Sequence, residues 1–312
     1  MSKAEDPSDK LPLRSTLSVI LLSFGGFLAV GPVVGILVAS VFYGFDFEKV
    51  MQLLSTIGSE DSFRLPLLLI QGIASLTGFV LIPYFFFRKR TESLIFSQEL
   101  DLSKIVLWTL LVFFIILSFM GINAVVIDWN ASIDFPSFMD GFEKWAKQSE
   151  KQAEVSTQFL INFSGWFEFL LGLIVIAIIP GVGEEIVFRG ILQKQLNYHW
   201  KNPHLAIWIS AILFSAFHFQ FYGFVPRAFL GALFGYLYLW SGHLIVPVIG
   251  HVINNGFTLT MAFLHSRKLI EFDIQETEYE FSLIPFLASL SLFLVFILYF
   301  RRLMNIEKAS HA

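Results

Sequence analysis

Long stretches without charge decide what this chain can fold into. Residues 15–45, 65–87, 105–127 and 281–300 contain no Asp, Glu, Lys or Arg. A helix needs about 20 apolar residues to cross the hydrocarbon core of a bilayer, because that core is about 30 Å thick and each residue rises about 1.5 Å. Each stretch is long enough, so each is predicted to be a membrane-spanning helix.

Three further apolar stretches are less regular. Residues 161–183 include Glu168, and residues 205–226 include His218. Residues 228–266 are too many for one helix and divide at the turn-like residues 240–243. The fold class predicted is therefore an all-α polytopic membrane protein with about eight transmembrane helices.

Composition agrees with a lipid surrounding. Of the 312 residues, 55% are hydrophobic and 15% are charged, whereas soluble domains carry about 25% charged residues. The net charge of −4 gives no basic field for nucleic acid. Cysteine is absent, which excludes disulfides, a cysteine nucleophile and cysteine-ligated zinc.

The loops suggest an orientation and five segments. Lys and Arg are more frequent in the loops on the side of the termini, and the run Arg88-Lys89-Arg90 directly follows a predicted span. This bias predicts cytoplasmic termini in a multi-pass protein of the cell (inner) membrane. The predicted segments are a cytoplasmic polar tail (1–14), three spans (15–128), an extracytoplasmic loop with an amphipathic helix (129–163), a polar-bearing membrane core (164–303) and a second cytoplasmic tail (304–312).

Ionisable and amide side chains inside spans carry the functional information, since each costs several kcal/mol unless it is paired or faces a cavity. Besides Glu168, they are Glu184, Glu185, Arg189, His218, His251, Asn254 and Asn255.

Glu184 and Glu185 follow Pro180-Gly181-Val182-Gly183 and allow two interpretations. In the structural one, Pro and Gly end a helix and the acids begin the next, where the helix dipole favours them. Glu185 and Arg189 then pair at i,i+4. In the functional one, one carboxylate is a general base in a low-dielectric pocket and Arg189 fixes the other. Neighbouring helical residues point about 100° apart, so the two acids cannot share one role.

The two histidines also have structural interpretations. His218 shares a helical face with Phe214, and His251 shares one with Asn255. Alone, His218 is a core histidine bonded to a backbone carbonyl, and His251 with Asn255 is a polar clamp between helices. Together with Glu184, they supply what is needed to activate a water and bind an oxyanion.

Three motifs carry a family resemblance. Residues 184–190 (EEIVFRG) fit EExxxRG, residues 214–218 (FSAFH) fit FxxxH and residues 251–255 (HVINN) fit HxxxN. In this order and spacing the chain resembles the CPBP family, the CAAX protease and bacteriocin-processing intramembrane endopeptidases, which include type II CAAX prenyl endopeptidases. The motif-bearing resemblance covers roughly residues 165–262, within the predicted core.

This resemblance implies peptide-bond hydrolysis in the membrane plane. Glu184 would activate water, His218 would position it, and His251 with Asn255 would stabilise the oxyanion. Glu185, Arg189 and Phe214 would be supporting residues. No cofactor is favoured by this interpretation, in which a glutamate-activated water does the chemistry.

Zinc is the alternative, with Glu184, His218 and His251 as ligands, because two His and one Glu also form a catalytic zinc set. The implied partners are the lipid bilayer and a membrane-associated peptide or protein substrate, lipidated substrates included. The substrate's identity and the oligomeric state stay open.

Two other functions compete. Buried Glu, His and Asn also form proton relays, so a proton-coupled transporter is one alternative, although the sequence lacks the internal repeat typical of many carriers. The other is a non-catalytic membrane scaffold or bacteriocin-immunity protein. Peptide cleavage would separate the protease from both.

Overall fold

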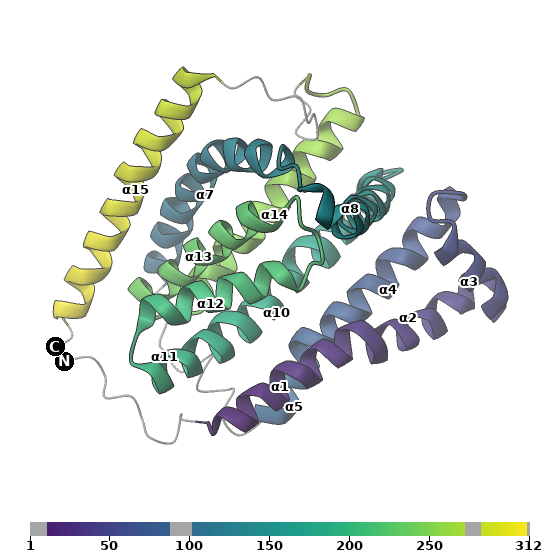
Figure 1. The fold of residues 1–312 in the computed structure, drawn as a ribbon, viewed down its shortest axis with the longest axis horizontal. Coiled ribbons are helices and arrows are strands. Elements are labelled where there is room, and N and C mark those ends of the chain that lie inside the picture. Colours follow the sequence, from purple (N-terminus) through teal and green to yellow (C-terminus); the bar gives the residue numbers. More distant parts are fainter. Residues whose placement is uncertain (1–10, 88–101, 272–281, 311–312) are drawn as a thin grey trace.

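The structure, a computed structural model, is a bundle of long helices and describes residues 11–87, 102–271 and 282–310 (Figure 1). The first half contains α1 (Leu13–Gly25), η2 (Gly26–Val30), α2 (Gly31–Ser40), η3 (Val41–Tyr43), α3 (Phe47–Ser55), η4 (Asp61–Phe63), α4 (Arg64–Leu76), η5 (Thr77–Leu81), α5 (Ile82–Phe87), α7 (Leu102–Ala131), η6 (Ser137–Met139) and α8 (Asp140–Ile161). The second half contains α9 (Trp166–Gly172), η7 (Leu173–Ile178), α10 (Ile179–Glu185), η8 (Ile186–Gln193), α11 (Lys194–Trp200), α12 (Pro203–Ala216), α13 (Phe224–Ser241), α14 (Ile245–Ser266) and α15 (Leu283–Ser310).

The helical membrane fold predicted from the sequence is confirmed. Within the described residues there is no strand, and 6 helical stretches are long and apolar enough to cross a membrane. They are Leu13–Tyr43, Asp61–Phe86, Leu102–Ala131, Trp166–Trp200, Ile245–Ser266 and Leu283–Glu307. The shorter helices α12 and α13 lie where the remaining two spans were predicted, and neither is among the 6 stretches. The predicted division near residues 240–243 is also confirmed, because α13 ends at Ser241 and Gly242 follows in the left-handed conformation (φ 74°).

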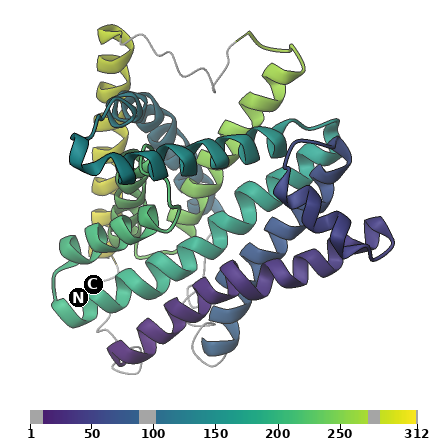
Figure 2. The ribbon, with the colours of Figure 1, turned by 45° about the vertical axis from the view of Figure 1, so that its right-hand side comes forward.

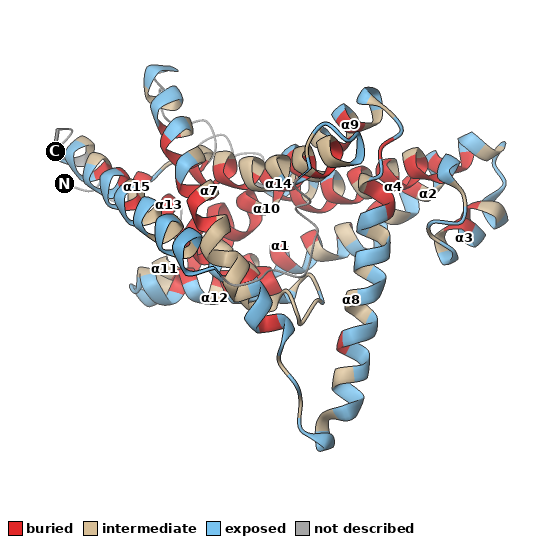
Figure 3. Cartoon of the chain, turned by 90° about the horizontal axis from the view of Figure 1, so that it is seen from above, coloured by how far each residue is buried: buried red, intermediate tan, exposed pale blue. Residues whose placement is uncertain are grey.

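The helices form a central group with flanking helices on two sides. Figure 1 shows α1, α2 and α4 on one side, α15 on the other, and α10, α12, α13 and α14 between them. Contacts join α4 to α10, α10 to α14, α13 to α14 and α7 to α15. Buried residues are concentrated in the central group, whereas α15 is largely exposed (Figure 3). Exposed apolar side chains such as Ile284 and Val295 suit a lipid surrounding.

Two sequence-based boundaries in the core are wrong. The helix predicted to end before Glu184 continues from Trp166 to Trp200 as one rod. Figure 2 shows this rod beside the first helical stretch of the chain, Leu13–Tyr43. Pro180 lacks an N–H but lies two residues after the end of the π-helical segment η7, where the regular hydrogen-bond pattern has already shifted. Gly181 and Gly183 permit close packing instead of ending the helix: an added Cβ would lie 2.7 Å from Val252 Cγ2 and 2.7 Å from Phe79 Cβ, respectively.

The second correction concerns residues 205–226, which are not one span. Helix α12 begins after Asn202, whose side chain accepts a hydrogen bond from Leu205 N, and ends at Ala216. A turn over residues 217–223 carries His218, and α13 then begins at Phe224. Because α12 stops well short of a full span, His218 lies deep in the bundle and close to Glu184.

The segments outside the core are described in part. Helix α8 occupies much of the predicted 129–163 loop and is largely exposed (Figure 3). Near the N-terminus, Leu11 N donates to Gln195 Oε1, and His199 Nε2 lies 3.1 Å from Leu11 O. The basic run Arg88-Lys89-Arg90 and most of the predicted 1–14 tail lie outside the described residues, as does the end of the 304–312 tail.

Candidate functional site

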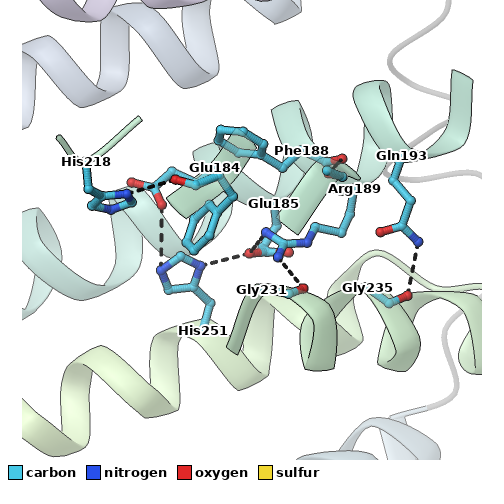
Figure 4. A network of polar contacts seen from close by, with 11 residues as sticks. Glu184, Glu185, Phe188, Arg189, Gln193, His218, Gly231, Gly235 and His251 are labelled. Atoms are coloured by element: carbon cyan, nitrogen blue, oxygen red, sulfur yellow. Dashed lines mark hydrogen bonds and ion pairs between the residues drawn. The ribbon is translucent and has the colours of Figure 1, made fainter. Parts of the chain in front are cut away.

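The residues singled out in the sequence come from three places in the fold. Glu184, Glu185 and Arg189 lie on the rod Trp166–Trp200. His218 lies in the turn after α12, and His251 lies on α14. Figure 4 shows that Glu184 has His218 on one side and His251 on the other. The structure therefore brings these motif residues together in the interior of the bundle.

Glu185 is the centre of a buried ionic network. Its Oε1 atom accepts from Arg189 Nη1 at 2.8 Å and lies 2.8 Å from His251 Nδ1 (Figure 4). The Glu185 side chain is 0% exposed and that of Arg189 is 1% exposed. An ionised carboxylate can only accept hydrogen bonds, so the proton between Glu185 and His251 belongs to Nδ1 of the imidazole. This bond fixes the orientation of the His251 ring.

Arg189 also ties the rod to α13. Its Nη2 atom donates to the carbonyl of Gly231 at 2.6 Å, and one turn further along both helices Gln193 Nε2 donates to the carbonyl of Gly235 at 3.0 Å. The glycines make this approach feasible: an added Cβ at Gly231 would lie 3.2 Å from Arg189 Nη2, and one at Gly235 would lie 2.8 Å from Gln193 Oε1. Gly231 and Gly235, four residues apart, thus form a small-xxx-small motif that lets the two helices pack closely.

Glu184 points away from this network, as expected for a neighbouring residue on a helix. Its side chain is 12% exposed, and its Oε2 atom lies 3.9 Å from His251 Nε2. That separation is longer than a direct hydrogen bond. Glu184 and Glu185 therefore occupy different positions relative to His251, one at each ring nitrogen.

His218 is held by its own backbone turn. Its Nδ1 atom lies 2.9 Å from the carbonyl of Phe214, and since a carbonyl only accepts, Nδ1 carries the proton. In the neutral ring, Nε2 then keeps a free lone pair. The Phe214 ring contacts both imidazoles edge-on, at 5.2 Å from His218 and 6.0 Å from His251, and lies 4.9 Å from Arg189 Cζ.

Asn255 lies one turn after His251 on α14, at the edge of this group. Its Nδ2 atom donates to the carbonyl of Ile176 at 3.2 Å, and its Oδ1 atom accepts from Asn254 Nδ2 at 3.1 Å. Among the described residues, no hydrogen bond joins Asn255 to Glu184, His218 or His251. One hydrogen of its amide is left for a further acceptor.

The donor types at the site suit zinc, but their placement does not. Both imidazoles donate Nδ1–H to a carboxylate or a carbonyl, as metal-ligating histidines do. Nevertheless, no group of three or more His, Asp or Glu side chains in the described part of the chain could hold a metal ion as placed. The geometry therefore gives no basis for a step through a metal.

Two residues near the site have no recognisable sequence signal. Asn130, at the end of α7, is fully buried; its Nδ2 donates to Phe221 O at 3.3 Å and its Oδ1 accepts from Val225 N at 2.9 Å. It therefore fixes the far end of the turn that carries His218. Arg227, in the first turn of α13, contacts the same turn through a hydrogen bond to Gln220. Neither residue belongs to a local motif, because each acts on a segment that only the tertiary fold defines.

Comparison with known proteins supports the resemblance. Residues 166–257 match the model of the family described as Rce1-like, type II CAAX prenyl endopeptidase Rce1-like. This match includes all of Glu184, Glu185, Arg189, His218, His251 and Asn255. Residues 166–257 are thus similar to the Rce1-like family, in agreement with the resemblance that the three motifs carry.

Three curated bacterial proteins are similar over parts of their length. Uncharacterized protein YpbD of Bacillus subtilis is 29% identical over 101 residues, covering 31% of this chain and 49% of YpbD. Membrane-embedded CAAX protease MroQ of Staphylococcus aureus is 31% identical over 100 residues, 30% of this chain and 40% of MroQ. Putative membrane peptidase YdiL of Bacillus subtilis is 27% identical over 180 residues, 58% of this chain and 66% of YdiL. The chain spans about half the length of these relatives, and no solved structure matches.

Proposed function

We propose that this chain is an intramembrane endopeptidase that hydrolyses peptide bonds of membrane-associated proteins or peptides, including lipidated ones. The observation that carries the proposal is the position of the Glu184 carboxylate between two imidazoles, one of which is fixed by a separate buried carboxylate. The Rce1-like match over this region and the similarity to a membrane-embedded CAAX protease support it. We place the protein in the cell (inner) membrane with both termini in the cytoplasm.

In this proposal Glu184 is the general base. It takes a proton from a water molecule as the water oxygen bonds to the scissile carbonyl carbon, and the carbonyl oxygen becomes an oxyanion. As the C–N bond breaks, the protonated Glu184 returns the proton to the leaving amine. His218, whose Nδ1 proton is already bonded to Phe214 O, offers Nε2 as an acceptor that holds the water. A positioned general base contributes about 10²–10⁴ in rate.

The oxyanion is stabilised from α14. Because Nδ1 of His251 donates to Glu185, its Nε2 donates only when the ring is an imidazolium. Our mechanism therefore requires His251 to be protonated on both nitrogens when the oxyanion forms. The free amide hydrogen of Asn255 is the second donor. One such donor is typically worth about 3 kcal/mol of transition-state stabilisation.

Glu185 and Arg189 act through His251 and are positioning residues. Glu185 fixes the ring, and Arg189 fixes Glu185 while its second nitrogen is bonded to α13. The proposal contains no metal step. Zinc bound by Glu184, His218 and His251 is the competing mechanism, and a chelator separates the two.

The deciding experiment compares the purified wild type with Glu184→Gln in detergent micelles, using membrane-anchored fluorogenic peptides. We expect cleavage by the wild type and a loss of about 10²–10⁴ in kcat/KM in the variant. Glu154→Gln makes the same substitution on the exposed face of α8 and controls for charge removal; its activity should match the wild type. Equal cleavage by Glu184→Gln and wild type would disprove the role of Glu184.

A chelator arm addresses the metal. Activity that is unchanged after dialysis against a strong chelator supports the glutamate-activated water. Activity that disappears with the chelator and returns only with Zn²⁺ would replace this mechanism with the zinc one. Thermal unfolding of each sample shows that the compared proteins are folded.

A further inference from the structure

Arg227 places a positive charge beside the turn that carries His218. It lies in the first turn of α13, and its Nη2 atom donates to Gln220 Oε1 at 2.9 Å. The guanidinium lies directly over Gly223, where an added Cβ would be 2.9 Å from Nη2 and 3.5 Å from Cζ. A side chain at position 223 would therefore displace the guanidinium, so glycine is needed for this position of Arg227.

The surroundings of Arg227 contain polar groups that are not satisfied. Its Nη1 atom is buried without a hydrogen-bond partner, and so are Glu150 Oε2 and the Tyr222 hydroxyl. Glu150 is linked to Arg227 by hydrogen bonds through Gln220, whose Nε2 atom donates to Glu150 Oε1 at 3.1 Å. An unpartnered buried donor costs about 1–3 kcal/mol, and more when it is charged. Such a group in a native structure calls for a ligand or another explanation.

The charge of Arg227 also acts on the candidate site. Arg227 interacts electrostatically with Glu184 and with His218. A carboxylate on a peptide bound there would be costly to bury without a cation. The guanidinium matches a carboxylate in both charge and planar geometry.

We propose that Arg227 binds a carboxylate of the peptide substrate and thereby selects which bond is presented to Glu184. This inference rests on the proposed peptidase function and adds a specificity-determining residue to it. Two sources of the carboxylate share this chemistry, the C-terminal carboxylate of the peptide and an Asp or Glu side chain near the cleaved bond. Glu150 competes with the substrate for the positive charge, so it weakens the preference.

Three reporter peptides test the proposal. All share one apolar anchor and one fluorogenic cleavable segment. The first ends in a free carboxylate and has no acidic side chain, the second ends in an amide and has none, and the third ends in an amide but carries one Glu near that end. Full-length wild type, Arg227→Gln, Arg227→Lys and Glu150→Gln are compared, with Lys151→Gln on the exposed face of α8 as the control.

We expect wild-type kcat/KM to favour a carboxylate peptide over the neutral amide by about tenfold or more. In Arg227→Gln this ratio should fall to about one, because cleavage of the carboxylate peptide slows more than cleavage of the amide peptide. Arg227→Lys should keep part of the preference, Glu150→Gln should increase it, and Lys151→Gln should match the wild type. The preferred peptide, first or third, identifies the source. A purely structural role would slow all three peptides equally, and an unchanged ratio in Arg227→Gln would overturn the proposal.

A binding arm separates this inference from the proposed function. The Kd of each peptide is measured by fluorescence anisotropy in the Glu184→Gln protein, with and without Arg227→Gln. If the wild type cuts nothing but a carboxylate peptide binds in an Arg227-dependent manner, the peptidase proposal fails and the carboxylate site stands. If binding shows no Arg227-dependent preference for a carboxylate, the inference fails whatever the cleavage result.

Discussion

The ion pair between Glu185 and Arg189 can be tested sharply because neither side chain reaches solvent; their exposed fractions are 0% and 1%. Removal of one partner of a buried pair leaves the other charge uncompensated, which typically costs about 3–5 kcal/mol. Arg189→Met leaves Glu185 with only His251 Nδ1 as a partner. Glu185→Gln leaves the guanidinium with the Gly231 carbonyl and the rings of Phe214 and Phe234, at 4.9 and 5.4 Å. We expect each change to lower the free energy of unfolding by about 3–5 kcal/mol.

The double variant Glu185→Gln/Arg189→Met removes both charges and should cost much less than the sum of the single changes. If each single change costs about 4 kcal/mol, independence would give about 8 kcal/mol for both. Loss of the whole pair leaves no unpaired ion, so we expect the double variant to cost about 3–5 kcal/mol, which corresponds to a coupling energy of about 3–5 kcal/mol. The coupling, not the size of either single effect, is the signature of charges that depend on each other.

The assay is reversible unfolding in mixed detergent micelles, followed by tryptophan fluorescence. Gln193→Leu is the matched control, because its bond to the Gly235 carbonyl repeats the Arg189–Gly231 contact without a charge. Gln193→Leu should lower the free energy of unfolding by about 1 kcal/mol. When it is combined with Glu185→Gln, the two losses should be additive within about 0.5 kcal/mol. If the Glu185 and Arg189 substitutions also add within that margin, the reasoning about the buried pair is refuted.

Three further predictions concern the surroundings of the site. Asn130→Ala removes both bonds that fix the turn carrying His218; kcat/KM of the folded protein should fall by about tenfold or more. Gly235→Ala places a Cβ 2.8 Å from Ile207 Cγ2, so the free energy of unfolding in denaturant titration should fall by about 1–3 kcal/mol. Burial raises the pKa of the Glu150 carboxyl above its usual value, so the folded state keeps a proton that the unfolded chain loses. Stability should therefore fall as pH rises from the ordinary carboxyl pKa through the raised one, and thermal unfolding of Glu150→Gln should lack that fall.

The membrane fold could be predicted from the sequence because hydropathy is a property of each segment alone. A stretch such as 105–127 has no charged residue, and a single apolar segment in lipid can satisfy its backbone hydrogen bonds only as a helix. Helix α7 (Leu102–Ala131) confirms the helix predicted there. The motif residues could likewise be selected one by one, since an ionisable group in a span is costly wherever it lies. Both inferences use local energies, so they do not require knowledge of the packing.

The helix end predicted before Glu184 was wrong because proline and glycine can serve close packing as well as end a helix. Pro180 and Gly183 have the composition of a helix break, but in a bundle the glycine leaves room for Phe79 and the proline follows a π-helical segment. Asn130 and Arg227 carry no signal at all. Their importance depends on the turn over residues 217–223, which has no regular pattern and meets them only in the folded chain.

The turn between α11 and α12 determines how deep in the bundle Glu184 and His218 lie. Helix α11 ends at Trp200, the next residue Lys201 has a left-handed backbone (φ 53°), and Asn202 caps α12. Glu184 and His218 lie equally far along the chain from Lys201, one on each arm of this helical hairpin. Both arms are helical over most of their length, so equal chain lengths bring the two side chains to a similar depth. The spacing between the EExxxRG and FxxxH motifs is thus a geometric requirement: an insertion in either arm would move the carboxylate and the imidazole apart, whereas an insertion in the loop between α14 and α15 would not.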